Sequence, residues 1–437
     1  MALIAFLMDI EEGHLLPSFS LAHSLKRFGH DIVYLSVPDN EEQIRKQGFG
    51  FVAILEDIYP KGFNQRLKEF VRRKGIQRAK IDREHMGALT DELVESVFKT
   101  VKPGLIIVSC FLHVEALVLF YKFKVQPVIF TPYIRDMNSS IYQDCIDEIM
   151  DMSGNKAMRL IELAREFGVK AGSLSQLAGP LNDFCEVVAC SDAIAVADRP
   201  ASANFHYIGP SVFRLTEADN GPIPGSIGGD KRVIYASMGS QVTSYGDTGR
   251  RVLEMIINVM KFKEMSGMHL ILAIGPEHEL NEFGSVPENV TLMKWVPQTE
   301  ILKVASLAIT HGGLGTVKEC IYYGVPMIVI PISRDQPSNA RRVEACKLGI
   351  QLKPGEVTEP ELFAAIRNVL GNDMIGDSVI RMQKVFRKQE ESDLGAHIIE
   401  GLLEVKGGDK VEVKGGGEVE IKGSDKVEVK GRDKVKI

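Results

Sequence analysis

A histidine, three glycines and a threonine between residues 311 and 316 form the part of the sequence best suited to binding an anion. They lie in the turn His311-Gly312-Gly313-Leu314-Gly315-Thr316, between the apolar stretch Leu307–Thr310 and a helical pattern. Glycines let backbone N–H groups approach an anion closely, and the N-terminus of a helix adds partial positive charge. His311 and Thr316 can each donate a hydrogen bond to the same phosphate. The turn therefore predicts a phosphate-binding site.

A second polar group follows the next apolar stretch, Val325–Ile330. Asp335 and Gln336 lie shortly after its end. Open α/β sheets bind ligands at the carboxyl ends of their strands, where a carboxylate and an amide can hold hydroxyl groups. Phosphate-binding and hydroxyl-binding groups at neighbouring strand ends predict a nucleotide-sugar site.

This part of the chain resembles the donor-binding signature of the family 1 glycosyltransferases, which include the UDP-glycosyltransferases of plants, animals and antibiotic producers. The matching residues are Trp295, Val296, Pro297, Gln298, His311, Gly313, Glu319, Gly324, Val325, Pro326, Pro331, Asp335 and Gln336. Among these proteins the chain is most similar to bacterial enzymes that glycosylate macrolides and other natural products. The resemblance implies the GT-B fold, in which two Rossmann-like domains face each other across a cleft.

The resemblance also assigns residues to the nucleotide. Trp295 stacks on uracil, Val296 and Gln298 belong to the same site, and Glu319 accepts both ribose hydroxyls. Two structural alternatives stay open: Trp295 as a core residue, and Glu319 as the partner of Thr316 in a helix capping box. A contact to the 2′-hydroxyl favours a UDP-sugar over a dTDP-sugar.

The diphosphate and the sugar have their own residues in this resemblance. The phosphate contacts are His311, Gly313, Leu314, Gly315 and Thr316. Ser237, Gly239 and Ser240 resemble a second phosphate loop, with an ordinary strand–helix turn as the alternative. Asp335 and Gln336 would hold sugar hydroxyls, and buried polar groups left unpaired cost roughly 1–3 kcal/mol each. A fully hydroxylated hexose, glucose by default, is therefore expected.

A candidate catalytic base lies near the N-terminus, at His14. It follows the first apolar stretch and is part of Gly13-His14-x-x-Pro17. An imidazole with a pKa near 6.5 suits general-base catalysis at neutral pH. In the family this histidine deprotonates the acceptor hydroxyl and is oriented by an aspartate. Here Cys110 stands at the aspartate position, next to Ser109.

Three explanations for the missing aspartate stay open, with Ser109 and Cys110 both kept as candidate site residues. Ser109 holds the imidazole as a neutral acceptor, or the acceptor substrate is acidic enough, like a phenol, to need little help. Alternatively, a carboxylate from elsewhere takes the role; the candidates are Asp9, Glu12, Glu115 and Asp136.

Strand and helix patterns alternate along most of the chain, which predicts an α/β fold with parallel, doubly wound sheets. The first patterns are Leu3–Met8, Pro17–Phe28, Asp31–Ser36, Asp91–Thr100, Leu105–Val108, Val114–Phe123 and Pro127–Thr131. After the Gly- and Pro-rich stretch Pro222–Asp230 come Val233–Ala236, Gly249–Phe262, His269–Ile274 and Val290–Leu292. The stretches Gly48–Arg83 and Ile134–Gly179 are less regular, and in the family such loops shape the acceptor pocket.

Five segments are expected. Residues 1–215 form the acceptor-binding domain, 216–230 a linker, and 231–377 the nucleotide-sugar-binding domain. A helical segment, 378–404, crosses back to the first domain in the family. Residues 405–437 hold four copies of an eight-residue unit, whose few apolar residues favour a mobile or marginal β-meander tail.

Composition excludes several classes of protein. A net charge of −6 argues against nucleic acid as the main partner. No apolar run reaches the ~18 residues that span a bilayer. The six cysteines lack Cys-x-x-Cys spacing, which predicts reduced thiols and a cytoplasmic protein.

The sequence therefore predicts an inverting glycosyltransferase that moves a hexose from a UDP-sugar to a small lipophilic acceptor. His14 is the expected base, and no cofactor or metal is expected because the chain contains no Asp-x-Asp motif. The alternative is a catalytically weak homologue that binds a ligand as an auxiliary or regulatory partner. A sugar-nucleotide epimerase of the same fold fits less well.

Overall fold

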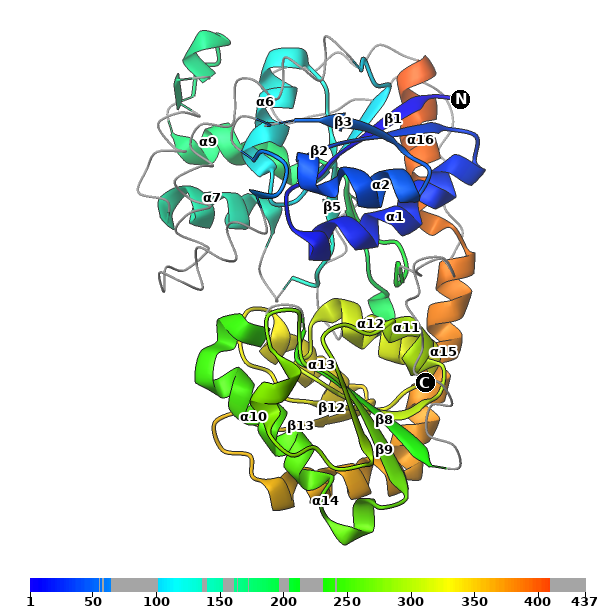
Figure 1. The fold of residues 1–437 in the computed structure, drawn as a ribbon. Coiled ribbons are helices and arrows are strands. Elements are labelled where there is room, and N and C mark those ends of the chain that lie inside the picture. Colours follow the sequence, from blue (N-terminus) through cyan, green and yellow to red (C-terminus); the bar gives the residue numbers. More distant parts are fainter. Residues whose placement is uncertain are drawn as a thin grey trace.

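The first domain is built on a sheet of seven parallel strands (Figure 1). The computed structural model describes residues 1–54, 56, 59–63, 101–135, 140–151, 161–162, 164–171, 173–195, 204–212, 231–239 and 242–408. The strands are β1 (Leu3–Leu7), β2 (Asp31–Ser36), β3 (Gly50–Ala53), β4 (Leu105–Ser109), β5 (Val128–Thr131), β6 (Glu186–Val188) and β7 (Phe205–Tyr207). Their order is β3-β2-β1-β4-β5-β6-β7. Because β1 and β4 are neighbours, the residues after these two strands meet at one edge of the sheet.

Strand β1 is apolar throughout because both faces of the sheet are covered. Ile4 and Phe6 pack into one apolar cluster with Phe19 of α1 (Glu12–Arg27), while Ala5 and Leu7 pack into another on the opposite face. Helix α1 begins with Glu12 and ends with Lys26 and Arg27, an order of charges that complements the helix dipole. The other described helices of this domain are α2 (Glu41–Lys46), α6 (His113–Phe123), α7 (Ile141–Asp151) and α9 (Leu174–Ala178).

The second domain has a parallel sheet of six strands, in the order β10-β9-β8-β11-β12-β13. The strands are β8 (Arg232–Ser237), β9 (Met268–Ala273), β10 (Val290–Met293), β11 (Ala305–Thr310), β12 (Met327–Val329) and β13 (Gly349–Gln351). Its helices are α10 (Gly246–Val259), α11 (Gln298–Leu302), α12 (Leu314–Tyr323), α13 (Gln336–Ala345) and α14 (Glu359–Gly371). The predicted phosphate turn lies between β11 and α12.

Two C-terminal helices connect the domains along one side of the molecule (Figure 1). Helix α15 (Asp373–Glu391) packs against α12, and α16 (Leu394–Gly408) packs against α1 of the first domain. Ser20 donates a hydrogen bond to Glu390 over 2.8 Å, which ties the end of α15 to α1. No helix among these described segments is both long and apolar enough to cross a membrane.

Two buried cations also bridge the domains. The ammonium of Lys318 on α12 donates to the backbone carbonyl of Ala189 over 2.7 Å. The guanidinium of Arg342 on α13 donates to the carbonyl of Arg135 over 3.2 Å. Both contacts run from the second domain to the first, close to the ends of the strands that carry the predicted site.

The main differences from the sequence expectations concern short elements. Strand β3 lies within the stretch expected to be irregular, and α10 begins at Gly246 rather than Gly249. Helix α16 continues to Gly408, so the first four residues of the repeat region are helical. The helix expected at 91–100, the linker at 216–230 and residues 409–437 lie outside the described residues.

Candidate active site

A histidine–carboxylate pair lies where β1 leads into α1, with Asp9 in the connecting loop and His14 in the first turn of α1. Nδ1 of His14 lies 2.8 Å from Oδ1 of Asp9, which also accepts the backbone N–H of Glu11 over 2.9 Å. The other carboxylate oxygen, Oδ2, accepts the hydroxyl of Ser109 over 2.5 Å. Ser109 ends β4, the neighbour of β1, so sheet topology brings these distant residues together. Of the four carboxylates considered from the sequence, Asp9 is therefore the one that holds His14.

The other three carboxylates are placed differently. Glu12 accepts a hydrogen bond from Gln43 over 3.2 Å. Glu115 is buried in the first turn of α6. Asp136 lies outside the described residues.

An aromatic ring fixes the plane of the imidazole. Phe111 stacks on His14 with ring centroids 4.0 Å apart and an angle of 12° between the planes. Tyr133 packs against the same Phe111 at 5.6 Å. His14 itself is three-quarters buried, with 24% of its side chain exposed. Its ring is thus held at one edge by Asp9 and on one face by Phe111.

The two partners shift each other's pKa. Burial raises the pKa of Asp9, but the interactions with His14, Ser109 and Glu11 outweigh it and hold the pKa below its usual value. Burial lowers the pKa of His14 and Arg334 opposes its charge, yet Asp9 and Glu11 raise the pKa above the usual value. The arrangement therefore stabilises the ion pair of carboxylate and imidazolium.

Cys110 lies outside this pair. Its thiol is buried and interacts with Thr131 and Tyr133, and burial raises its pKa to about 12. Nearby, Arg135 bonds to Glu186 over 2.9 Å in a buried polar cluster. Cys110 thus belongs to the packing behind the site, and the arrangement gives no support to the catalytic role predicted for it. Ser109 is in contact with the pair, but through Asp9 rather than the imidazole.

The predicted phosphate turn forms an open helix N-terminus. Helix α12 starts at Leu314 with Gly313 as its N-cap, and no side chain caps it. Thr316 and Glu319 both lie inside the helix, so the capping-box alternative for this pair is wrong. The glycine cap leaves the first N–H groups of α12, including that of Gly315, without a capping side chain.

His311 is held between two glycines. A Cβ atom on Gly313 would lie 2.6 Å from Nε2 of His311, and one on Gly239 would lie 2.7 Å from the same ring. Gly239 also has a positive φ of 82°, which a side chain would strain. Burial lowers the pKa of His311 to about 4, despite a hydrogen bond to the Ser237 backbone. Ser237 and Gly239 therefore contact the predicted phosphate residue directly, whereas Ser240 lies outside the described residues.

The predicted ribose residues form a hydrogen-bonded group. The amide of Gln298 contacts Glu319 and lies 3.3 Å from the hydroxyl of Thr316, while its carbonyl accepts the hydroxyl of Tyr235 over 2.6 Å. Burial raises the pKa of Glu319 to about 7, although Gln298 and Lys318 oppose the shift.

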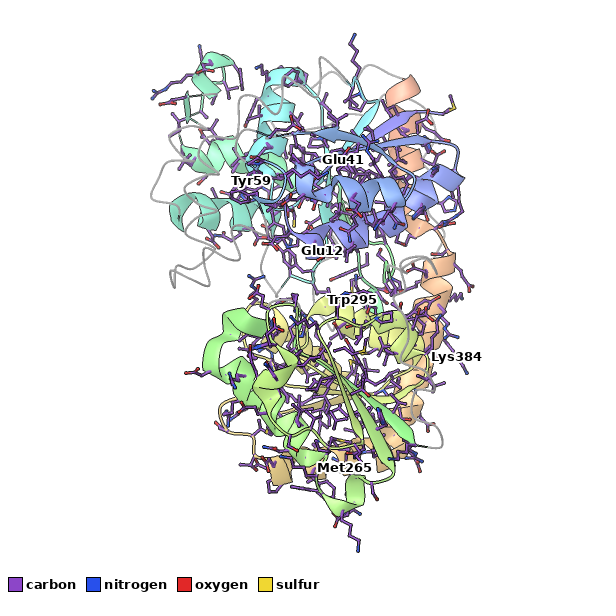
Figure 2. The ribbon with its side chains drawn as sticks, viewed as in Figure 1. Glu12, Glu41, Tyr59, Met265, Trp295 and Lys384 are labelled. Atoms are coloured by element: carbon purple, nitrogen blue, oxygen red, sulfur yellow. The ribbon has the colours of Figure 1, made fainter. Side chains whose placement is uncertain are left out.

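The first two residues of the Trp-Val-Pro-Gln motif differ in exposure. Trp295 is 54% exposed, which makes the core-residue alternative wrong, and it lies on the side of the second domain that faces the first (Figure 2). Val296 is buried. An exposed indole beside a buried anchor is suited to stacking on a flat ring.

The predicted sugar residues are partly occupied by internal hydrogen bonds. The amide carbonyl of Gln336 accepts the N–H groups of Ile332 and Ser333, and its NH₂ donates to Tyr245 over 2.9 Å. Asp335 accepts from Asn339 over 2.8 Å through one oxygen. Gln336 thus shapes the loop, and Asp335 is the more accessible of the two.

Arg334, just before these residues, was not predicted. It has an exposed side chain and a positive φ of 58°, and its charge reaches His14 in the other domain. Five other described non-glycine residues also have a positive φ, so the feature that marks Arg334 is its charge near His14 rather than its backbone.

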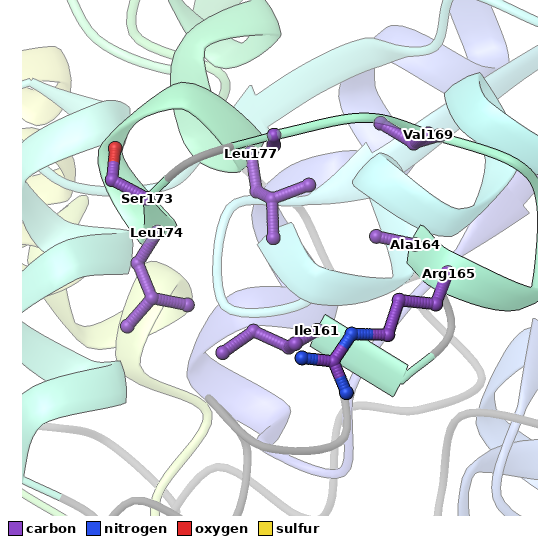
Figure 3. Close-up of a pocket in the computed structure, with 8 residues that line it drawn as sticks. Ile161, Ala164, Arg165, Val169, Ser173, Leu174 and Leu177 are labelled. Carbon is purple, nitrogen blue, oxygen red and sulfur yellow. The ribbon is translucent and has the colours of Figure 1, made fainter.

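A separate hollow lies in the first domain beside α9 (Figure 3). It is lined by Ile161, Ala164, Arg165, Val169, Ala171, Ser173, Leu174 and Leu177. None of the predicted site residues lines it, although it falls within the stretch expected to shape the acceptor side.

Comparison with known proteins finds similar glycosyltransferases. Residues 263–389 match the family described as "Erythromycin biosynthesis protein CIII-like, C-terminal domain". The NDP-glycosyltransferase YjiC of Bacillus subtilis is 24% identical over 395 residues, 90% of this chain and 95% of YjiC. These matches support a bacterial natural-product glycosyltransferase of family 1.

Other family 1 relatives match over shorter segments. The uncharacterized UDP-glucosyltransferase YdhE of Bacillus subtilis is 29% identical over 46% of this chain, and the match spans about half of YdhE, 48% of its length. Demethyllactenocin mycarosyltransferase of Streptomyces fradiae is 33% identical over 31% of this chain and 29% of its own length.

Solved structures confirm the fold. The glycotransferase of kitacinnamycin superposes with a TM-score of 0.70 at 21% identity, covering 92% of this chain and 98% of that one. CalG4, the calicheamicin glycosyltransferase, gives a TM-score of 0.67 at 19% identity over 93% and 98%. The predicted GT-B arrangement of two parallel α/β domains is confirmed.

Proposed function

We propose that this family 1 protein transfers a hexose from a nucleoside-diphosphate sugar, UDP-glucose by preference, to a hydroxyl of a small lipophilic acceptor. The observation that carries the proposal is the imidazole of His14, held by Asp9 on the first domain, in a molecule whose second domain presents an open helix N-terminus beside His311. His14 supplies a base for the acceptor, and the helix N-terminus supplies an anion site for the donor.

The reaction is a single displacement. The acceptor oxygen attacks the anomeric carbon while its proton moves to Nε2 of His14. The bond between that carbon and the β-phosphate oxygen breaks, and its electron pair leaves with the nucleoside diphosphate. Attack opposite the leaving group inverts the anomeric centre.

The leaving diphosphate gains negative charge at the N-terminus of α12. The backbone N–H groups there, His311 and the hydroxyl of Thr316 would stabilise it. Because these groups are fixed before the reaction, we propose that transfer proceeds without a metal ion.

The preference among donors depends on the residues that would contact the ribose. Glu319 and Gln298 can accept and donate to the 2′- and 3′-hydroxyls, and Trp295 can stack on the base. Relatives differ in this respect: YjiC is named an NDP-glycosyltransferase and YdhE a UDP-glucosyltransferase, while spinosyn rhamnosyltransferase SpnG was solved with thymidine diphosphate. Glu319 is the reason to favour UDP here.

The acceptor side is apolar. Half-buried side chains pack against the apolar cluster that contains Ala5 and Leu7; they include Ile10, Tyr133, Tyr142, Ile146 and Phe111, which stacks on His14. Such a lining suits a lipophilic acceptor. The alternative of a binding-only homologue rested on the missing aspartate, and Asp9 supplies a carboxylate, which favours the enzyme.

Acceptor-dependent release of UDP tests this function. The full chain is mixed with UDP-glucose and a panel of aromatic alcohols and phenols, and the glycoside is detected by mass spectrometry. His14→Ala should lower kcat by roughly 10²–10⁴ and leave UDP affinity intact, because proton transfer acts in the transition state.

His23→Ala is the matched control, since His23 lies on the same helix and bonds to Gln47. It should retain wild-type activity. Full activity in His14→Ala would contradict the proposed base. Binding of UDP-glucose without any acceptor-dependent turnover would favour the auxiliary-protein alternative.

A further inference from the structure

The carboxylate beside His14 follows β1 rather than β4. The family resemblance places an aspartate after β4, where this chain has Cys110. The structure instead presents Asp9, two residues after the end of β1, in the loop that leads to the first turn of α1, where His14 lies. The role inferred for Asp9 rests on the proposed function, because it concerns the base of that reaction.

Three hydrogen bonds hold the carboxylate in one orientation. Oδ1 accepts from Glu11 and His14, and Oδ2 accepts from Ser109. Asn40, which follows β2, adds a fourth bond: its side-chain amide donates to the backbone carbonyl of Asp9 over 3.3 Å. With only 12% of its side chain exposed, Asp9 is fixed before any substrate arrives.

This arrangement selects one tautomer of the imidazole. An ionised carboxylate only accepts hydrogen bonds, so Nδ1 of His14 must carry the proton. Nε2 is then the acceptor and can take a proton from substrate. Phe111 limits rotation of the ring out of this plane.

We propose that Asp9 is the positioning residue for His14, and that it allows this enzyme to glycosylate weakly acidic aliphatic alcohols as well as phenols. An alcohol keeps its proton until the new bond is well advanced, so the imidazolium must form in the transition state. A fixed carboxylate stabilises that cation. A phenol is acidic enough to react with less help.

The neutral side chain of Cys110 is consistent with Asp9 as the positioning residue. Its thiol lies in the buried cluster with Arg135 and Glu186, and the charge of Asp9 already acts on it. A second carboxylate at position 110 would face both Asp9 and Glu186, while the cation beside it, Arg135, is already paired with Glu186; like charges in a buried place oppose ionisation. A neutral side chain at 110 is therefore compatible with the carboxylate at position 9.

The test compares two acceptors of similar shape, 2-naphthol and 2-naphthylmethanol, with UDP-glucose as donor. Asp9→Asn should lower kcat on the alcohol by roughly 10²–10⁴, because the amide can force the wrong tautomer, but on the naphthol by no more than about tenfold. Ser109→Ala should show the same pattern with a smaller loss. Asp31→Asn, at an exposed carboxylate that begins β2, is the control and should match wild type.

A second readout does not depend on turnover. In NMR spectra of protein labelled at histidine, the His14 signal, assigned with His14→Gln, should titrate at lower pH in Asp9→Asn than in wild type. UDP affinity should be equal in both proteins.

Equal losses on both acceptors, or an unchanged His14 titration, would overturn the assignment. If the wild type glycosylates neither acceptor, the proposed function fails on these substrates, and the titration alone still decides the role of Asp9.

Discussion

The proposed donor and acceptor halves of the site differ in how their residues are distributed along the chain. The proposed donor half draws most of its residues from one continuous stretch, 295–336, around one helix N-terminus. The proposed acceptor half joins Asp9 and His14, which follow β1, to Ser109 and Phe111 at the end of β4 and to Tyr133 after β5. Local motifs can specify the first kind of site, whereas the second depends on which strands become neighbours.

The two histidines differ in the same way as the two halves. His14 is three-quarters buried, with a raised pKa beside a carboxylate, while burial lowers the pKa of His311 to about 4. In the proposed reaction His14 accepts a proton, whereas His311 is neutral in the absence of a bound anion. Variants of the two should therefore fail in different ways.

The largest expected effect on donor binding is at His311. His311→Ala should weaken UDP binding by roughly 10–100-fold, because it removes a donor to the phosphates beside the helix N-terminus. Isothermal titration with UDP measures this change. His269→Ala, whose ring bonds to Thr291 on a neighbouring strand of the same domain, should bind UDP like wild type. Unchanged affinity in His311→Ala would remove His311 from the site.

A smaller effect is expected from the glycine beside it. Gly313 has a φ of −58°, which alanine tolerates, so among the described residues the obstacle is the His311 ring, 2.6 Å from an added Cβ. Gly313→Ala should displace the imidazole and weaken UDP binding by about tenfold. Gly371→Ala, where an added Cβ meets nothing within 4 Å, is the matched control. Equal affinities in the two variants would show that the packing of Gly313 on His311 does not matter.

A third prediction concerns stability rather than UDP binding, at Glu319. Its folded-state pKa of about 7 lies above the ordinary value of 4.5, so the folded protein binds an extra proton between these pH values. The stability due to this proton is present below pH 4.5 and is lost as the pH rises through 7. Compared with Glu319→Gln, the wild type should lose on the order of 1–3 kcal/mol of unfolding free energy between pH 5 and 8. Urea unfolding measures the difference, and parallel pH curves for the two proteins would contradict it.

The same difference between local and distant residues decides what could be predicted from the sequence. The parallel α/β class, the phosphate turn and its helix were readable because each depends on local periodicity and a short motif. The role of Gln336 was not, since its amide is occupied by Ile332, Ser333 and Tyr245, the last from a distant loop. Asp9 was one of four carboxylates considered; it lies five residues before His14, and the pairing of β1 with β4 adds the bond from Ser109 that fixes it. Arg334 gave no sequence signal, because its backbone conformation is a property of the folded loop.

In the proposed reaction, a base on the first domain and an anion site on the second act together on one sugar. The most direct test is the anomeric configuration of the product from UDP-α-glucose and 2-naphthylmethanol, determined by proton NMR. Direct displacement with His14 as base predicts the β-glucoside from the wild-type enzyme. An α-glucoside, or glucose released by hydrolysis alone, would contradict it.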